Sequence, residues 1–260
     1  MVTLRRMIPG PVKPALRWGR DLMNGTIRRR TQYRRHGLKF SAGEAFRTLA
    51  AGGRLNPYQP LYGAQKPYLS QFPATKRFCE ERWSTIAPYL PTSGSAMDIG
   101  SQNGYFVFQM ATHGLIALGV EREHSAYRAS QILALLNSVD RASFVHLDVT
   151  EATVRDLPTV DVVVCMAVFH HWVHQHDLDY ATRIMRALAA RTGSVMVFET
   201  GQPDQTQIWW SRNLGFMGDN PRPWIDDFLK DLGFAQVQHV GEFVAKEQSK
   251  FKRHLFICKK

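Results

Sequence analysis

Three acidic residues each stand at the end of a short apolar run. Asp98, Glu121 and Asp148 occupy these positions, about 25 residues apart. An ionised carboxylate can only accept hydrogen bonds, so it suits partners that donate them, such as sugar hydroxyls or an adenine amino group. In an open parallel sheet, ligands bind beyond the carboxyl ends of the strands. We therefore expect the three acids to surround one nucleoside-like ligand.

A turn marked by two glycines follows directly. Residues 98–104 read Asp-Ile-Gly-Ser-Gln-Asn-Gly, so Gly100 and Gly104 flank Gln102. Glycine has no Cβ, which lets the backbone approach a ligand closely. The tighter Gly-x-Gly-x-x-Gly turn of dinucleotide-binding enzymes is missing, which disfavours a nicotinamide cofactor.

Apolar runs that alternate with helical patterns must position these residues. Such alternation predicts a mainly parallel sheet with helices on both faces. The predicted strands are residues 95–99, 116–121, 143–147, 160–166, 194–199, 235–240 and 253–258. The predicted helices are residues 74–90, 105–113, 125–139, 178–191 and 224–232, with a short turn near 151–157. The last two strands have no helix between them, so they predict a closing hairpin.

These motifs resemble the class I S-adenosylmethionine-dependent methyltransferases. The resemblance rests on residues 98–104, 120–121, 147–149 and 161–171. It implies an α/β, Rossmann-like, seven-stranded, mainly parallel sheet with helices on both faces and an antiparallel last strand. It also implies S-adenosyl-L-methionine as the cofactor.

The resemblance assigns cofactor contacts residue by residue. It implies Gly100 and Gly104 at the methionine moiety, Glu121 on the ribose, and Asp148 with Val149 around the adenine. It also implies backbone carbonyls near Cys165 and Met166 close to the cofactor amino group. Asp98 can orient the turn or meet a cationic amine through water. Gln102 replaces the usual middle glycine, where it narrows the space or supplies an amide.

A histidine-rich segment follows the fourth predicted strand, where methyl acceptors approach in this family. His170 and His171 are the candidate catalytic residues, because an imidazole can take a proton as a methyl group arrives. The alternative is that they pack or cap, since proximity and alignment alone can support methyl transfer. His170 and His174 have a metal-ligand spacing. We predict no metal site, because this segment reads as a loop, Asp177 caps the next helix, and no cysteine or glutamate lies nearby.

Aromatic and basic side chains follow the fifth predicted strand. Glu199 ends that strand and is expected to face the cleft. Residues 201–224 are interpreted as a lid insertion. The candidate substrate-binding residues there are Trp209, Trp210, Arg212 and Arg222. Aromatic faces with arginines can bind a sugar, a ring or a phosphorylated group, or the tryptophans can pack the lid against the body.

The positive charge is concentrated in an N-terminal arm. The net charge is +11, and residues 1–40 hold eleven Lys and Arg against one acid. Their partly helical, amphipathic pattern suits an anionic membrane surface, nucleic acid, or the surface of the body. We divide the chain into this arm, a cover and helix at 41–93, and a cofactor-binding domain at 94–260. Three scattered cysteines and the lack of a long apolar run favour a cytoplasmic protein, peripheral at the inner face of a membrane if the arm binds there.

The resulting hypothesis is a methyltransferase that acts on oxygen or nitrogen of a small molecule, saccharide or lipid-linked glycan. An RNA (tRNA) modifying methyltransferase is the alternative, with the arm as its phosphate-binding extension. The near-neutral body and the lack of a recognisable RNA-binding module argue against that alternative. A non-catalytic interaction protein has no physical need of three acids at strand ends.

Overall fold

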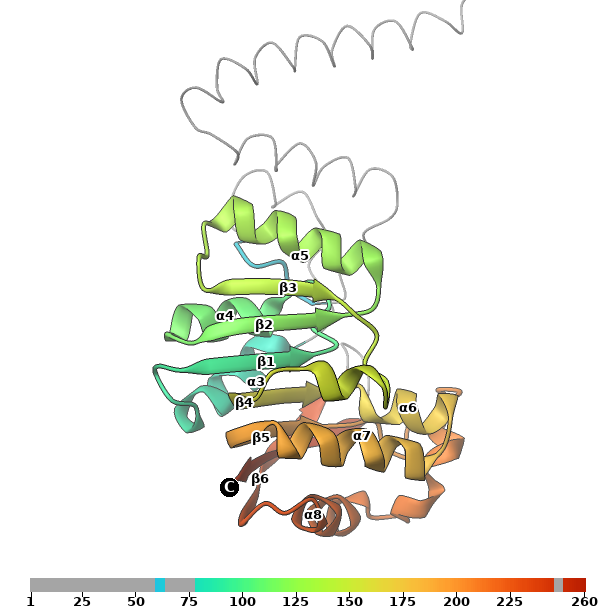
Figure 1. The fold of residues 1–260 in the computed structure, drawn as a ribbon. Helices are drawn as coiled ribbons and strands as arrows, with labels where there is room; N and C mark the ends of the chain where they lie inside the picture. Colours follow the sequence, from blue (N-terminus) through green and yellow to red (C-terminus); the bar gives the residue numbers. More distant parts are fainter. Residues whose placement is uncertain (1–58, 64–77, 246–249) are drawn as a thin grey trace, which may run out of the picture.

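A seven-stranded sheet forms the centre of the described part of the chain. The computed structural model describes residues 59–63, 78–245 and 250–260. Within them the strand order is β3-β2-β1-β4-β5-β7-β6, with β7 antiparallel to both of its neighbours (Figure 1). The strands are β1 (Ser95–Ile99), β2 (Ile116–Glu121), β3 (Ala142–His146), β4 (Val160–Met166), β5 (Thr192–Glu199), β6 (Gln236–Val244) and β7 (Lys252–Lys259). This arrangement confirms the predicted Rossmann-like sheet and its closing hairpin.

Helices cover both faces of the sheet (Figure 1). One apolar cluster joins α3 and α4 to one face, and another joins α6, α7 and α8 to the other. The α-helices are α3 (Cys79–Ile86), α4 (Tyr105–His113), α5 (His124–Asn137), α6 (Phe169–Gln175), α7 (Leu178–Ala190) and α8 (Pro221–Asp231). Short 3-10 helices are η2 (Ala87–Tyr89), η3 (Thr153–Asp156) and η4 (Ser211–Met217).

Local sequence explains the central elements. The β4 residues Val162, Val163 and Val164 are fully buried, as expected for a strand covered on both faces, and β-branched residues favour this conformation. Asp177 caps α7, because its side chain accepts a hydrogen bond from the backbone N–H of Tyr180. This cap confirms the prediction from sequence.

One predicted loop is a helix. Residues 169–175, which contain the histidine-rich segment, form α6 rather than a loop leading into α7. Phe169, Trp172 and Val173 point into the core, so tertiary packing stabilises about two turns of helix whose residues have only modest helical propensity. Other differences are shifts of element ends. The predicted helix at 74–90 is observed as α3 and η2, and its first four residues lie outside the described ranges.

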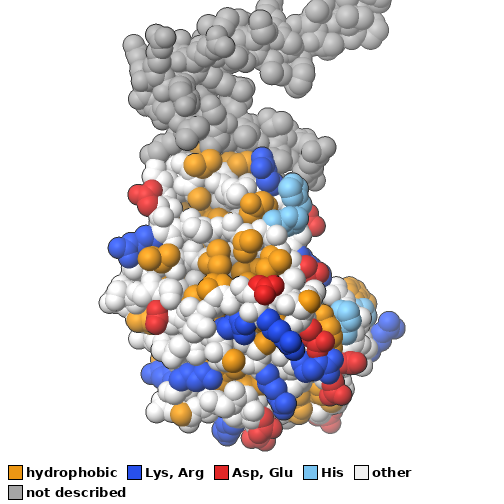
Figure 2. All heavy atoms as spheres, in the orientation of Figure 1, with side chains coloured by type: hydrophobic (Ala, Val, Ile, Leu, Met, Phe, Trp, Pro, Cys, Tyr) orange, Lys and Arg blue, Asp and Glu red, His pale blue; other side chains and the backbone are white. Residues whose placement is uncertain are grey.

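The basic arm also lies outside the described residues, so its predicted helix stays a prediction. Among the residues that are described, no helix has the length and apolar character needed to cross a membrane. On the face shown in Figure 2, acidic and basic side chains are intermixed on the lower half of the described surface. This mixture agrees with the near-neutral charge of residues 41–260, which hold 22 basic and 21 acidic side chains.

Candidate functional site

A pocket of about 300 Å³ opens at the carboxyl ends of the parallel strands. It is lined by eight of the residues singled out from sequence as cofactor or catalytic candidates. These are Asp98, Gly100, Gln102, Glu121, Asp148, Val149, Met166 and His171. The residues come from β1, β2, β4, α6 and the loop after β3, so the sheet topology brings together positions that are far apart in sequence.

The turn after β1 is held against β2 by hydrogen bonds. The backbone N–H groups of Gly100 and Ser101 both donate to the carbonyl of Val120, at 2.8 and 3.1 Å. Glu121 accepts from the backbone N–H of Gln102 at 2.8 Å and from that of Glu123 at 2.6 Å. One buried carboxylate therefore ties together the two loops that border the pocket.

Asp98 is buried beneath this turn. Burial raises the pKa of its carboxyl group well above the ordinary value, and the neighbouring Glu121 raises that pKa further. Its Oδ2 contacts no hydrogen-bond partner among the described residues. Polar side-chain atoms of Ser101, Gln102 and Asn103 are likewise buried without a partner there. Unpaired buried polar groups are costly, and Asp98 and Gln102 line the pocket, so a polar ligand there could complete the hydrogen bonds of these two residues.

Gly100 and Gly104 exclude a side chain for different structural reasons. A Cβ on Gly100 would lie 2.7 Å from Cγ2 of Val168, at the rim of the pocket. A Cβ on Gly104 would lie 2.6 Å from the ring of Phe144, and Gly104 does not line the pocket. Both glycines also have positive φ angles. The structure therefore explains Gly104 by ring packing and turn geometry.

The loop after β3 and the end of β4 form another side of the pocket. Asp148 is exposed and its backbone carbonyl accepts a hydrogen bond from Thr153 at 2.6 Å, while Val149 is buried. Met166 ends β4, and the following Ala167 has a positive φ of 59°. This non-glycine residue in the left-handed region turns the chain sharply from β4 toward α6.

A charged wall closes the opposite side of the pocket. Arg82 of α3 donates from Nε to Glu199 Oε2 at 2.6 Å, and Arg253 of β7 places Nη1 3.8 Å from Glu199 Oε1. All three side chains are buried. Arg82 also donates to the carbonyls of Phe78 and Val244. Two guanidinium groups face one carboxylate, so this wall carries a net positive charge.

Glu199 lines the pocket, as expected from the sequence, whereas the positions of Arg82 and Arg253 were not predicted. Arg82 precedes the first strand and Arg253 lies on the last one, and neither belongs to a local motif. Arg82 and Arg253 reach the pocket because α3 and β7 both lie against the end of β5. Arg82 follows Glu80 and Glu81, and Arg253 lies between Lys252 and His254, so neither arginine stands out from its neighbours in the sequence.

The two candidate catalytic histidines lie in different surroundings. His171 lines the pocket, and burial lowers the pKa of its imidazole to about 4, helped by Arg122 and Arg253. His170 is buried outside the pocket lining, where its Nδ1 accepts a hydrogen bond from the backbone N–H of Gly201 at 3.0 Å. The structure thus separates a pocket histidine from a packing histidine.

The four candidate substrate-binding residues do not line this pocket. Trp210 is buried, with its ring 4.2 Å from that of His170 and beneath the guanidinium of Arg253. Trp209 is 56% exposed, and Arg212 and Arg222 are exposed as well. Trp210 therefore packs against Arg253 of the charged wall, which agrees with the packing alternative for Trp210 but not for the exposed Trp209.

Comparison with known proteins identifies the type of domain. Residues 97–197 match the protein family described as a methyltransferase domain. The O-antigen chain terminator bifunctional methyltransferase/kinase WbdD of Escherichia coli is 24% identical over 165 residues, which cover 63% of this chain and 22% of that protein. The chain thus spans less than a quarter of this curated relative.

Solved structures share the fold. A structure of the bifunctional kinase-methyltransferase WbdD superposes with a TM-score of 0.66 and 22% identity, covering 82% of this chain and 45% of the other. Magnesium protoporphyrin IX methyltransferase from Synechocystis PCC 6803 with bound SAM has a TM-score of 0.51 and 14% identity, covering 70% and 77%.

Proposed function

Because this chain carries a class I S-adenosylmethionine-dependent methyltransferase domain, we propose that it transfers the methyl group to an oxygen or nitrogen of a saccharide, free or lipid-linked. The observation that carries this proposal is the pocket with two chemically different sides. One side has the unpaired polar atoms and acids of the β1 and β2 ends, and the other has the Arg82–Glu199–Arg253 wall.

The first side fits the cofactor by its donor and acceptor groups. Asp98 would face the cationic amino group, Glu121 the ribose hydroxyls, and Asp148 with Val149 the adenine. Each Glu121 oxygen already accepts one backbone N–H, and a carboxylate oxygen has capacity for a second hydrogen bond. Gly100, Gln102 and Met166 would complete the cradle. When bound, S-adenosylmethionine supplies an electrophilic methyl group on a sulfonium.

The second side fits a polar acceptor. Arg82, Glu199 and Arg253 offer donors and acceptors in a buried setting, where hydrogen bonds to hydroxyl groups orient a substrate strongly. The neutral His171 beside them can accept the proton that an acceptor hydroxyl loses as its oxygen takes the methyl group. The similarity to a protein named as an O-antigen chain terminator supports a saccharide acceptor.

Cofactor affinity tests the first side. Glu121→Gln keeps the size of the side chain but removes its charge, so we expect S-adenosylmethionine to bind about 10- to 100-fold more weakly, the loss typical for hydrogen bonds to a charged group. Isothermal calorimetry measures this. Glu151→Gln, at an exposed ion pair with Arg183, is the matched control and should bind as the wild type does. Equal affinity in all three proteins would remove Glu121 from the cofactor site.

Labelled cofactor tests the acceptor. We expect methyl transfer to oligosaccharide or lipid-linked glycan fractions, and none to tRNA. Arg253→Gln should raise the KM for the acceptor while cofactor affinity stays unchanged, and Arg253→Lys should restore part of the loss because it keeps the charge. Methylation of tRNA without methylation of saccharide would overturn the assignment and favour the RNA alternative.

A further inference from the structure

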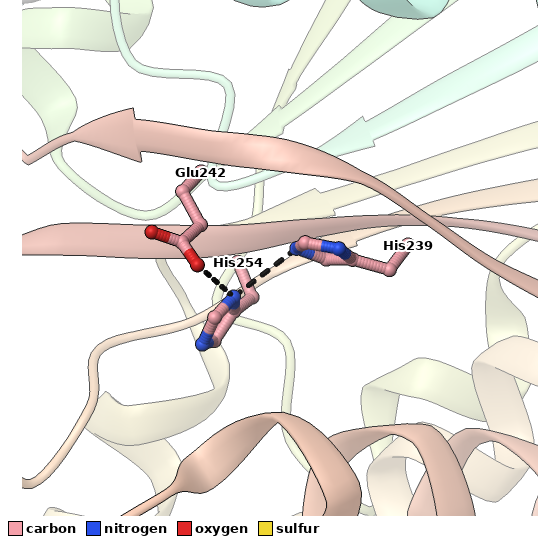
Figure 3. Close-up of side chains that lie close together, drawn as sticks. All are labelled: His239, Glu242 and His254. Carbon is pink, nitrogen blue, oxygen red and sulfur yellow. Dashed lines mark hydrogen bonds and ion pairs between the residues drawn. The ribbon is translucent and has the colours of Figure 1, made fainter.

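Two histidines and a glutamate converge on the β6–β7 hairpin (Figure 3), and none of the three lines the pocket. His254 Nδ1 lies 3.1 Å from His239 Nε2 and 3.5 Å from Glu242 Oε1. One ligand atom from each residue lies within 4.8 Å of the others. We call these three residues the hairpin cluster.

An irregularity in β6 creates the hairpin cluster. His239 and Glu242 are three residues apart, and in a regular strand such residues point to opposite faces. Here the register with β7 shifts between His239 and Gly241, and Gly241 has a φ of 150°. The extra residue makes His239 pair with Phe256 and Glu242 pair with His254. Because Phe256 and His254 are two apart on β7, both β6 side chains reach the same face.

The distances suit a small tetrahedral cation. Zinc binds histidine nitrogen at about 2.0–2.1 Å in a tetrahedron, so neighbouring ligand atoms lie about 3.3–3.4 Å apart. The 3.1 and 3.5 Å separations around His254 Nδ1 bracket that value. Two histidines with one glutamate are also an established zinc ligand set, with a fourth position left for water.

Charged side chains of α8 lie near the hairpin cluster. Arg222 acts on both His239 and His254, and Asp226 acts on His239. Asp226 is itself paired with Lys230. The carboxylate that can ligate a cation directly is therefore Glu242, which lies 3.5 Å from His254 Nδ1.

We propose that His239, Glu242 and His254 form a binding site for a divalent transition-metal ion of the zinc type. His254 is adjacent in β7 to Arg253, whose side chain points to the other face and lines the pocket. The metal would join β6 to β7 directly behind the charged wall. This departs from our prediction of no metal site, which considered only the histidines of α6.

Zinc titration of the full chain tests the site. After treatment with a chelator and dialysis, calorimetry with zinc chloride should show one tight site per chain, and zinc should raise the Tm. Glu242→Gln should weaken zinc binding by at least about tenfold, and His254→Ala should do so too, because losses of 10- to 100-fold follow even from changes behind the ligands. Magnesium, which prefers oxygen ligands, should leave the Tm unchanged.

A matched histidine pair separates this site from adventitious binding. His124 and His146 also lie close, with ring centroids 5.0 Å apart, and His124→Ala should keep full zinc affinity. Glu242 is exposed, so Glu242→Gln is expected to fold normally, and unchanged cofactor affinity would verify this. Zinc binding that is absent in the wild type, or that is equal in the wild type and in both cluster variants, would overturn the proposal.

Discussion

Asp98 combines burial with an oxygen that contacts no described partner. Because its folded-state pKa lies above the ordinary 3.8, the folded protein retains the proton to higher pH than the unfolded chain does. In the absence of ligand, Asp98 therefore lowers the free energy of unfolding as pH rises from about 4 toward the raised pKa. A cationic ligand reverses this preference, because it favours the ionised carboxylate.

We predict that S-adenosylmethionine binding releases a proton from Asp98. Cofactor affinity should then increase as the pH rises from about 4, the ordinary pKa, toward the raised pKa of Asp98, and the binding heat should depend on the ionisation enthalpy of the buffer. Asp98→Asn should abolish most of this dependence. Calorimetry in two buffers at several pH values measures both quantities, and the same pH slope in the variant would contradict the assignment.

His171 leads to a different pH prediction. With a pKa of about 4, its imidazole is neutral across the physiological range. His171→Gln should lower kcat by about tenfold and leave cofactor affinity unchanged. We expect a smaller loss than the ~10²–10⁴ that removal of a base with a well-matched pKa causes, because a pKa of about 4 makes His171 a weaker base. The wild-type rate should show no acid limb centred near pH 6.5. Such a limb in steady-state kinetics would indicate that another group is the base.

His170→Gln is the control for this neighbouring ring. Gly201 N–H donates to His170 inside the core, so the substitution should lower the Tm more than His171→Gln does. Sequence alone could not separate these adjacent histidines. Their roles depend on which face of α6 meets the core. Phe169, Trp172 and Val173 have helical spacing, but seven residues are too few for that spacing to predict a helix.

At the scale of elements, one buried ion pair joins α3 to the sheet. Arg82 and Glu199 are 117 residues apart in sequence and both buried. We predict that Arg82→Ala lowers the free energy of unfolding by about 3–5 kcal/mol, because it leaves Glu199 buried without its closest cation. Urea denaturation measures the loss.

Arg183→Ala is the matched comparison, since Arg183 pairs with Glu151 on the exposed surface of α7. Exposed ion pairs contribute little, so its urea midpoint should stay close to that of the wild type. Equal effects of the two substitutions would show that the Arg82–Glu199 pair does not anchor α3.

Most elements could be predicted because local patterns determine them. Runs such as residues 160–166 and the alternation of strands and helices yield the sheet, and all three strand-end acids line the pocket. The charged wall could not be predicted from the sequence, because Arg82 and Arg253 come together only in the tertiary structure. The hairpin cluster could not be predicted either, because a shift of one residue in the strand register decides which face of the sheet His239 occupies.

At the scale of the whole molecule, charge is divided between the arm and the rest of the chain. Residues 1–40 carry a net charge of +10. We predict that deleting them abolishes co-sedimentation with anionic lipid vesicles, because each basic residue near such a surface contributes about 1 kcal/mol. S-adenosylmethionine affinity should be unchanged.

Vesicles of neutral lipid and a tRNA retention assay complete this test. Binding to neutral vesicles should be weak for both proteins. If the truncated protein still sediments with anionic vesicles, the arm is not the membrane contact. If deletion instead removes only tRNA retention, the arm serves a nucleic acid.

The placement of β7 also matters while the protein is being made. β7 follows β6 in the chain but inserts between β5 and β6. Until β7 has been synthesised, β5 has one open edge and β6 has no neighbour to pair with, which are conditions that favour aggregation. A chain whose synthesis stops before residue 252 would therefore expose the open edge of β5 and an unpaired β6. Binding of that edge by a chaperone would protect such a chain from aggregation.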